Sequence, residues 1–429
     1  MPDKRLLVVG TTSDYIDHIR TRYPGRALFV TDPAERAAAL EKDPAPADEL
    51  LCDLQNANRV YEELRAHVSR WRIGICGVVC YDCESLGLAA DLAKQFALPF
   101  PEPAAVRVSR NKFLSKQIRQ KAAIPCPRTA VVRNLADALK FRAQIAKPVI
   151  IKPLTGSGSE LLFKCDNRID CSRAVDLIGR KLASHPNVRM YRPQKCGTVK
   201  MDPHQDFAIE EFIDGREYSC DFTLDGDQLE IIRLAKKIQA PDQAAGTTLA
   251  YVLPSQLPEP LQIDLFRLQL QAAARALGLN RAICMVDFIV HDDVAYLLEM
   301  TPRPGGDCLP PTIFQSCGLD MLGLALDFAE ARPIALPAAS SWVQMVGLRL
   351  MAKKSGMIKK IDDLALRRDS RVKELHLKRR PGQRVVLPPD DYESRLLGNV
   401  IFKPVRPQSI ETECSELESK LIVEIEAEP

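Results

Sequence analysis

The sequence of 429 residues lacks a strong net charge, a long apolar run and a low-complexity tract. Its 59 lysines and arginines nearly balance its 56 aspartates and glutamates, so the net charge of +3 gives no global field that would hold nucleic acid or an anionic membrane. No uncharged apolar run reaches the roughly 18 to 20 residues that span a bilayer, because Asp320 and Asp327 interrupt the longest candidate, 313–329. We therefore expect a soluble protein with neither a membrane nor a nucleic-acid partner.

The N-terminal residues also lack the pattern of an export signal. The apolar run Leu6–Gly10 is too short for a signal-peptide core, and no small-residue cleavage site follows it. The 13 cysteines are odd in number and are scattered through apolar stretches of a long chain, which favours reduced thiols. These features predict a cytoplasmic protein.

An apolar fraction of 46% is enough to bury the cores of roughly two to four domains. Residues 1–108 alternate short apolar runs with helix-like stretches, which predicts βα units around a parallel sheet. Pro99, Pro101 and Pro103 interrupt this pattern, and we place the first domain boundary just after them. The next helix is expected to begin at Ser109, a residue type that caps helices well.

The remaining chain has the pattern of an α+β domain followed by a smaller β-rich part. Strand-like and helix-like stretches mix over 109–335, and short β-like runs fill 336–410. The acidic residues 411–429 are expected to form a fraying edge or a tail. The expected fold class is therefore α/β followed by α+β.

The most informative stretch is 148–159, where a buried strand delivers Lys152 to a loop of small residues. Without large side chains, backbone N–H groups can approach phosphate oxygens while the lysine supplies a point charge. A flexible hairpin turn beside an exposed lysine is the alternative. The stretch is not a Walker A loop, since no Gly-Lys-Ser/Thr follows at the required spacing.

A second element is the apolar strand expected at 207–211, about 60 residues after Lys152. This apolar strand ends in Glu210 and Glu211, and a second strand starts at Glu217. Such a hinge can offer backbone groups to a purine edge and a carboxylate to ribose hydroxyls. A charged hairpin on a solvated face is the alternative.

A third element is a pair of strands joined by a short turn at 291–293. Antiparallel pairing across this turn would bring Asp287 and Glu299 close together, and carboxylates are the hard oxygen ligands that Mg²⁺ prefers beside nucleotide phosphates. Arg303 follows with a guanidinium fork that matches a phosphate or a carboxylate.

In this order and spacing, the elements together resemble the ATP-grasp superfamily of carboxylate-amine ligases, over most of the chain. Ser109–Leu114 is similar to the family's opening helix with its nucleotide-binding lysine, and residues 1–108 resemble the Rossmann-like domain that precedes it. Val346–Arg349, Pro381–Gly382 and Leu397–Val400 are similar to the C-terminal β-rich subdomain of the group that includes bacterial L-amino acid ligases. The resemblance implies an ATP-grasp fold with two α+β lobes between these flanking parts.

The resemblance also implies which residues bind ATP. The residues that would contact the phosphates are Lys112, Lys152, Thr155, Gly156, Ser157, Gly158 and Ser159. Those that would line the adenine pocket are Glu210, Glu211 and Ile213, the first two partly through their backbone, and Glu217 would hold the ribose.

By the same resemblance, Asp287, Glu299 and Thr301 would bind Mg²⁺ or Mn²⁺, and Arg303 and Lys152 would be catalytic. The family usually has Asn where this chain has Thr301, so the metal site departs from the pattern there. The implied reaction converts a small carboxylate to an acyl-phosphate, after which an amine displaces phosphate. Catalysis of this kind is mostly positioning and charge neutralisation, so no general base has to be visible. A homodimer is left open.

Two other functions compete with this interpretation. Thr301 suggests an ATP-binding regulatory protein of the same fold with weak turnover. Cys76, Cys80 and Cys83 have the C-x3-C-x2-C spacing of radical iron–sulfur enzymes, but an aspartate precedes the last cysteine where an aromatic is usual. We interpret these cysteines as small buried hydrophobic residues at a strand end.

Two basic stretches are expected to be solvated. The segment 353–384 has few aromatics among its charges, which favours a lid or a phosphate-facing patch over a nucleic-acid interface. Lys236 and Lys237 follow Glu230 on a strand from which they could reach the site, but a solvated lysine pair is the favoured interpretation.

Overall fold

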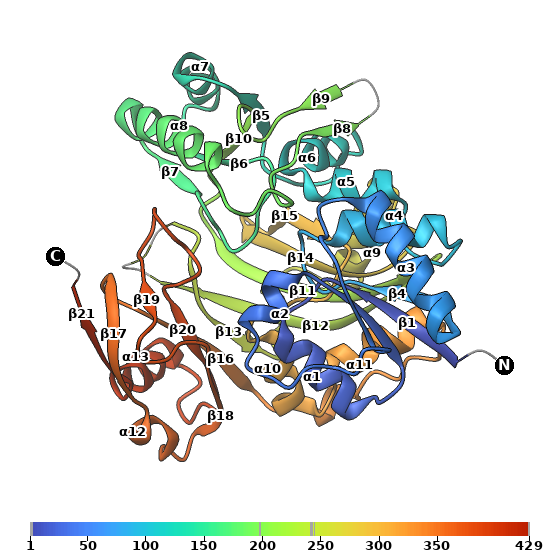
Figure 1. Ribbon diagram of the computed structural model, residues 1–429. Coiled ribbons are helices and arrows are strands. Elements are labelled where there is room, and N and C mark those ends of the chain that lie inside the picture. The colour runs from blue at the N-terminus through green and yellow to red at the C-terminus, as the bar shows by residue number, and fades with distance from the viewer. Residues whose placement is uncertain (1–2, 197–198, 241–242, 244, 428–429) are drawn as a thin grey trace.

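The structure is a computed structural model that describes residues 3–196, 199–240, 243 and 245–427 (Figure 1). Its N-terminal part has the expected parallel sheet, with strand order β3-β2-β1-β4. The strands are β1 (Asp3–Val9), β2 (Ala27–Thr31), β3 (Glu49–Leu51) and β4 (Ile73–Val79), and the helices between and after them are α1 (Ser13–Arg22), α2 (Pro33–Ala38), α3 (Ala57–Trp71) and α4 (Leu86–Gln95). Alternate residues of β1 enter two different hydrophobic clusters, so both faces of this sheet are covered.

The helix expected to begin at Ser109 begins three residues later. Ser109 lies near the end of α5 (Pro103–Arg110), and α6 spans Lys112–Lys121. Asn111 separates the two helices because its backbone is extended and its side chain accepts hydrogen bonds from the N–H groups of Phe113 and Leu114, at 3.1 and 2.9 Å. The N-cap is therefore Asn111, and the expectation for Ser109 was wrong.

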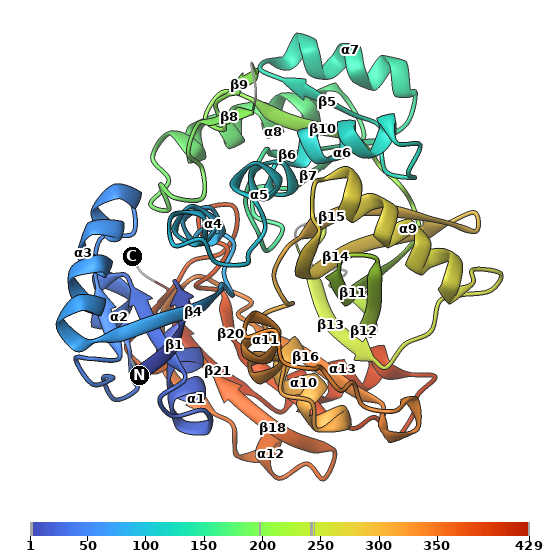
Figure 2. The same ribbon diagram turned by 90° about the vertical axis from the view of Figure 1, so that its right-hand side faces the viewer.

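A small lobe follows, visible at the top of Figures 1 and 2. Its antiparallel sheet has the order β5-β10-β6-β7 and is covered by two helices. The elements are β5 (Thr129–Val132), α7 (Leu135–Ile145), β6 (Val149–Pro153), β7 (Phe163–Cys165), α8 (Arg168–Ala183) and β10 (Phe207–Glu211). A two-stranded ribbon, β8 (Gln194–Cys196) with β9 (Val199–Met201), lies beside them.

The largest element is an antiparallel sheet of eight strands in the order β15-β14-β11-β12-β13-β16-β20-β18. The strands are β11 (Arg216–Asp225), β12 (Gln228–Gln239), β13 (Thr248–Leu253), β14 (Arg281–His291), β15 (Val294–Thr301), β16 (Met345–Met351), β18 (Val372–Leu377) and β20 (Leu396–Phe402). The sheet takes strands from both sides of the boundary expected at residue 335. The two parts therefore share one continuous sheet.

The two faces of the large sheet have different coverings. Helix α9 (Ile263–Ala276) packs on one face, and α10 (Leu309–Cys317), α11 (Met321–Ala329) and part of the N-terminal sheet pack on the other (Figure 2). The polar residues described below lie on this second face. No helix in the described residues is both long and apolar enough to cross a membrane.

The described residues of the acidic stretch 411–429 are folded, so the expectation of a tail was wrong, and the last strand lies at the edge of a three-stranded sheet. Helix α13 (Ile410–Ser419) buries an apolar stripe, and β21 (Ile422–Glu426) pairs with β17 (Gly356–Asp362), which also pairs with β19 (Arg384–Val385). The remaining short helices are α12 (Leu364–Arg367) and a 3-10 turn at Ala339–Ser341.

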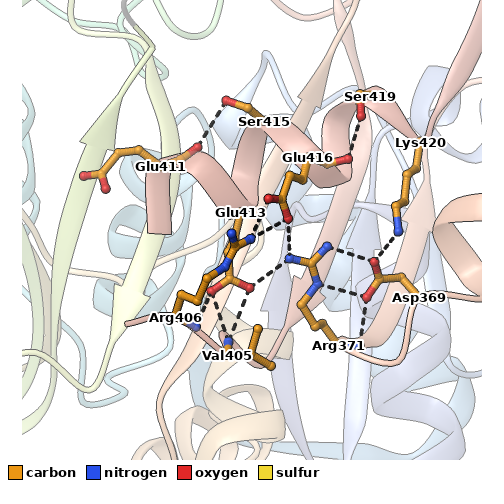
Figure 3. A network of polar contacts seen from close by, with 10 residues as sticks. All are labelled: Asp369, Arg371, Val405, Arg406, Glu411, Glu413, Ser415, Glu416, Ser419 and Lys420. Carbon is orange, nitrogen blue, oxygen red and sulfur yellow. Dashed lines mark hydrogen bonds and ion pairs between the residues drawn. The ribbon is translucent and has the colours of Figure 1, made fainter. Parts of the chain in front are cut away.

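Paired charges allow these acidic residues to fold. The buried carboxylate of Glu413 accepts hydrogen bonds from the N–H groups of Val405 and Arg406 and from Arg371 (Figure 3). Arg371 also binds Glu416. Because each buried acid has a cationic or N–H partner, the net acidity of the segment does not oppose folding.

Candidate active site

Glu210 is held between two lysines. Its carboxylate oxygens lie 2.8 Å from Lys152 Nζ and 2.8 Å from Lys116 Nζ. Burial alone would raise the pKa of Glu210, but the two ammonium groups outweigh it and lower this pKa to about 2. The ionised carboxylate therefore fixes the ammonium groups of Lys152 and Lys116, and its side-chain oxygens are taken up by these two ion pairs.

Lys116 is a site residue that the sequence analysis missed. It lies one turn after Lys112 on α6, is fully buried, and donates a hydrogen bond to the carbonyl of Leu298 on β15, at 2.6 Å. Its spacing of four residues from Lys112 places both on one helix face, and this was the signal that could have found it.

Lys112 connects the small-residue loop to the strand pair. Its Nζ donates to the carbonyl of Gly156 at 2.8 Å and lies 3.8 Å from the carboxylate of Glu299. Burial lowers the pKa of Lys112, and Glu299 opposes this shift. Lys112, Lys152 and the loop therefore meet in the structure, as their expected roles require.

The loop of residues 155–159 is fixed at both ends and exposed in the middle. Thr155 Oγ1 donates to the carbonyl of Met190 and Ser159 Oγ to that of Gly246, each at 2.8 Å. Gly156 has φ +114°, which disfavours any side chain there. The tip, Ser157 and Gly158, is exposed to solvent.

The residues expected around the adenine and ribose do not share one surface. Adjacent residues of a strand point to opposite faces, so Glu211 turns away from Glu210 and accepts a hydrogen bond from Arg128 Nε at 2.9 Å. Ile213 is buried. The carboxylate of Glu217 accepts hydrogen bonds from Lys237 and Gln239.

The two carboxylates expected to bind metal face one another as the turn predicted. Asp287 pairs with Glu299 in the β14–β15 ladder, and Thr301 lies two residues beyond Glu299 and is buried. Asp287 Oδ1 is buried without a hydrogen-bond partner, and several cations, Lys112 first among them, lower the pKa of Glu299 against its burial. A buried orphan oxygen beside a second ionised carboxylate fits a divalent cation.

In the part of the chain that the structure describes, no three histidine, cysteine, aspartate or glutamate side chains form a group that could hold a metal ion. Within that part, Asp287 and Glu299 are thus a pair of carboxylates only. Of the three spaced cysteines, Cys76 is half-buried, and Cys80 and Cys83 are buried.

Cys83 contacts the arginine of the site. Arg303 Nε donates to Cys83 Sγ at 3.1 Å, and its Nη1 donates to the carbonyl of Pro304 at 2.7 Å. The chain after Arg303 is anchored at Gly305, whose N–H donates to Asp221 at 3.1 Å. Asp221 is itself paired with the equally buried Arg233, which makes this anchor rigid.

The expectation of a solvated lysine pair was wrong for Lys237. Lys236 is 43% exposed in its side chain, whereas Lys237 is buried and lies 3.3 Å from Asp287. The alternation of β12 separates them, and Lys237 shares the sheet face of Asp287.

Comparison with known proteins agrees with this architecture. Residues 145–311 match the ATP-grasp domain family, and the chain therefore contains an ATP-grasp domain. An L-amino acid ligase from Bacillus licheniformis superposes with a TM-score of 0.76 at 19% identity, covering 99% of this chain and 100% of that one. A biotin carboxylase from Campylobacter jejuni gives 0.66 at 17% identity, covering 99% and 92%. The expected ATP-grasp fold is confirmed.

Among curated relatives, carnosine synthase 1 from Gallus gallus is 27% identical over 370 residues, which are 81% of this chain and 37% of that protein. The chain thus spans little more than a third of the length of this relative. An uncharacterized protein, y4rH, from Sinorhizobium fredii is 21% identical over 84% of this chain and 70% of its own length.

Proposed function

We propose that this protein, whose chain contains an ATP-grasp domain, is an ATP-dependent carboxylate-amine ligase that releases ADP and phosphate. The observation that carries the proposal is the convergence of Lys112, Lys152 and the loop 155–159 on the strand pair that presents Asp287 and Glu299. Cations for phosphates and carboxylates for a divalent metal are the two requirements of phosphoryl transfer. The similarity to an L-amino acid ligase and to carnosine synthase supports a ligase.

In this proposal the phosphates of ATP lie between the loop 155–159 and the lysines, with Lys152 placed by Glu210. Asp287 and Glu299 would hold Mg²⁺ or Mn²⁺, which supplies charge neutralisation at the phosphates. Thr301 would reach the metal through water. Glu217 would hold the ribose, and Ile213 would line the adenine pocket together with the backbone of Glu210 and Glu211.

The chemistry then follows from positioning. An oxygen of the substrate carboxylate attacks the γ-phosphorus, and the bond to ADP breaks. Arg303 would stabilise the resulting acyl-phosphate through its guanidinium fork. The nitrogen of the amine attacks the acyl carbon, phosphate leaves with its bonding electrons, and the nitrogen gives up one proton to the phosphate or to solvent. We further propose that the enzyme acts in the cytoplasm on small substrates.

A second candidate is an ATP-binding regulatory protein with weak turnover. Two observations favour it: Lys237 already neutralises Asp287, and Thr301 replaces the usual Asn. This candidate predicts nucleotide binding without ligation.

The test is release of ADP and phosphate from ATP and Mg²⁺ in the presence of pairs of amino acids. A ligase gives equal amounts of both products and a new amide by mass spectrometry, and Glu299→Gln abolishes them while the exposed Glu230→Gln does not. If ATP binds by calorimetry and no pair is joined, the regulatory candidate replaces the ligase. If ATP does not bind, both fail.

A further inference from the structure

Arg395 is a buried arginine without a carboxylate partner among the described residues. It precedes β20, is 3% exposed, and donates to Gln243 Oε1 at 3.0 Å, to Thr247 Oγ1 at 3.2 Å and to the carbonyl of Tyr392 at 3.3 Å. All three acceptors are neutral oxygens. A buried guanidinium is ordinarily paired with an anion, since desolvating an unpaired charge is costly.

A second arginine lies beside it. Arg349 on β16 donates to the carbonyl of Thr248 at 3.0 Å, and its Nε lies 2.8 Å from Asp307. Burial and the nearby charge of Arg349 both lower the pKa of Arg395. The two guanidinium groups therefore repel one another, and among the described residues only Arg349 is paired with a carboxylate, that of Asp307.

The polar groups around these arginines are incompletely satisfied. Asn399 pairs with Arg349 across the β16–β20 ladder, is 4% exposed, and has a buried Oδ1 without a hydrogen-bond partner. Asp307 Oδ1 is likewise buried and without one. Native interiors rarely leave such groups without a protein, water or ligand partner, so the site has polar groups available to a ligand.

Sheet register places these groups on the face of the candidate active site. Lys237 pairs with Tyr251 and Tyr251 with Gly347, two residues before Arg349. Residues opposite one another, and those two apart, point to the same face. Arg349 and Asn399 therefore face the same side as Lys237 and Asp287.

The covering loop ties the arginines to the phosphate loop. Thr247 and Thr248, which contact Arg395 and Arg349, directly follow Gly246, whose carbonyl accepts the hydrogen bond from Ser159. The residues that contact the two arginines are therefore only one and two positions along the chain from the residue that contacts the loop 155–159.

We infer that Arg395, together with Arg349, binds a carboxylate group of a substrate other than the carboxylate that is phosphorylated. A guanidinium fork matches a carboxylate with two parallel hydrogen bonds, and the shortage of one negative charge is made up when that group binds. The group can belong to an amino acid that serves as the amine, or to a dicarboxylate that is activated at its other end. This inference rests on the proposed function and names its substrate class.

Binding tests the inference without turnover. The midpoint of thermal unfolding is measured for the full chain with Mg²⁺ and a non-hydrolysable ATP analogue, adding each free amino acid or its C-terminal amide, and succinate or its monoamide. We expect at least one free acid to raise the midpoint where its amide does not. If free amino acids raise the midpoint, the bound carboxylate belongs to the substrate that supplies the amine. If succinate raises it, the carboxylate belongs to the substrate that is phosphorylated.

Variants localise the effect. Arg395→Met should lose the stabilisation by the free acid, Arg395→Lys should keep part of it, and Arg368→Met, at an exposed arginine of the same part of the chain, should keep all of it. The inference is overturned if no free acid stabilises the wild-type protein, if amides act equally well, or if Arg395→Met responds like the wild type. The response to the ATP analogue alone reports separately on the nucleotide site.

If the protein joins a pair of substrates, the KM values of the reaction provide a second test. Losing a charge-assisted contact raises the KM for the anionic substrate about tenfold to hundredfold in Arg395→Met, while the KM for ATP stays unchanged. An equal loss for ATP and for the substrate would indicate a purely structural role for Arg395 and contradict the inference.

Discussion

The ammonium group of Lys237 lies 3.3 Å from Asp287 and also contacts Glu217, so one buried cation joins the proposed metal ligand to the proposed ribose ligand. Burial would lower the pKa of Lys237, but Asp287 and Glu217 outweigh it and raise this pKa. The lysine is therefore charged at neutral pH and competes with a divalent metal for Asp287.

Lys237→Met should tighten Mg²⁺ binding. Removing a repulsion of about 1 kcal/mol corresponds to about a fivefold lower Kd for Mg²⁺ in the presence of an ATP analogue. Turnover should fall because Asp287 and Glu217 lose the group that holds them in place. Calorimetry measures the metal affinity, and the exposed neighbour Lys236→Met serves as the control. Unchanged metal affinity would show that Lys237 and the metal do not share Asp287.

Substitutions of Lys152 and Lys116 should have different effects, the first on ATP binding and the second on stability. Lys152→Ala leaves Glu210 with Lys116, so we expect a folded protein whose affinity for ATP falls about tenfold to hundredfold through loss of a charge-assisted contact. Lys116→Ala removes a fully buried cation and should cost about 3 to 5 kcal/mol of stability. Calorimetry with ATP and urea unfolding check the two variants. ATP affinity unaffected by Lys152→Ala would exclude Lys152 from the site.

Local patterns predicted the strands that carry this site, and pairing across a short turn predicted Asp287 beside Glu299. The Rossmann-like sheet followed from alternating apolar runs for the same reason. These strands and the turn depend on residues close together in the sequence, so local sequence patterns predict them.

The partners of the site residues could not be predicted in this way. Lys116, Lys237 and Arg395 act through residues 20 to 180 or more positions away, or through loops without a distinctive pattern. The acidic C-terminal segment was expected to fray, whereas its counter-charges, Arg371 among them, come from an earlier part of the chain. Long-range charge pairing leaves no periodic signal in the sequence.

Thr301 should limit the metal site. Thr301→Asn supplies an amide oxygen with longer reach, so we expect a lower Mg²⁺ concentration for half-maximal turnover and equal or higher turnover. Thr301→Val keeps the shape and removes the hydroxyl, so it should raise that concentration. Glu299→Gln should remove turnover. If both Thr301 variants behave like the wild type and Glu299→Gln still turns over ATP, this strand is not part of the metal site.

Asp320 should make the docking of the N-terminal sheet sensitive to acid. Its carboxylate caps α11 by accepting hydrogen bonds from the N–H groups of Leu322 and Gly323. The same carboxylate lies 2.8 Å from His18 Nε2, on α1, and 2.9 Å from the hydroxyl of Tyr23, directly after α1. Burial would raise the pKa of Asp320, but these partners lower it to about 2. Because the folded pKa lies below the unfolded value, the stabilisation is present above about pH 4 and is lost as the pH falls toward 2.

Asp320→Asn keeps an oxygen that can cap α11, but it removes the charge and replaces the acceptor oxygen that faces His18 and Tyr23 by an amide N–H donor. At pH 7 we expect it to lower the free energy of unfolding by about 1 to 2 kcal/mol, within the roughly 2 to 3 kcal/mol that such a pKa shift allows. The difference from the wild type should shrink between pH 4 and pH 2, since the wild-type carboxyl is then protonated as well. Urea unfolding at a series of pH values measures this difference. A difference that stays constant down to pH 2 would mean that the charge of Asp320 does not hold α11 against α1.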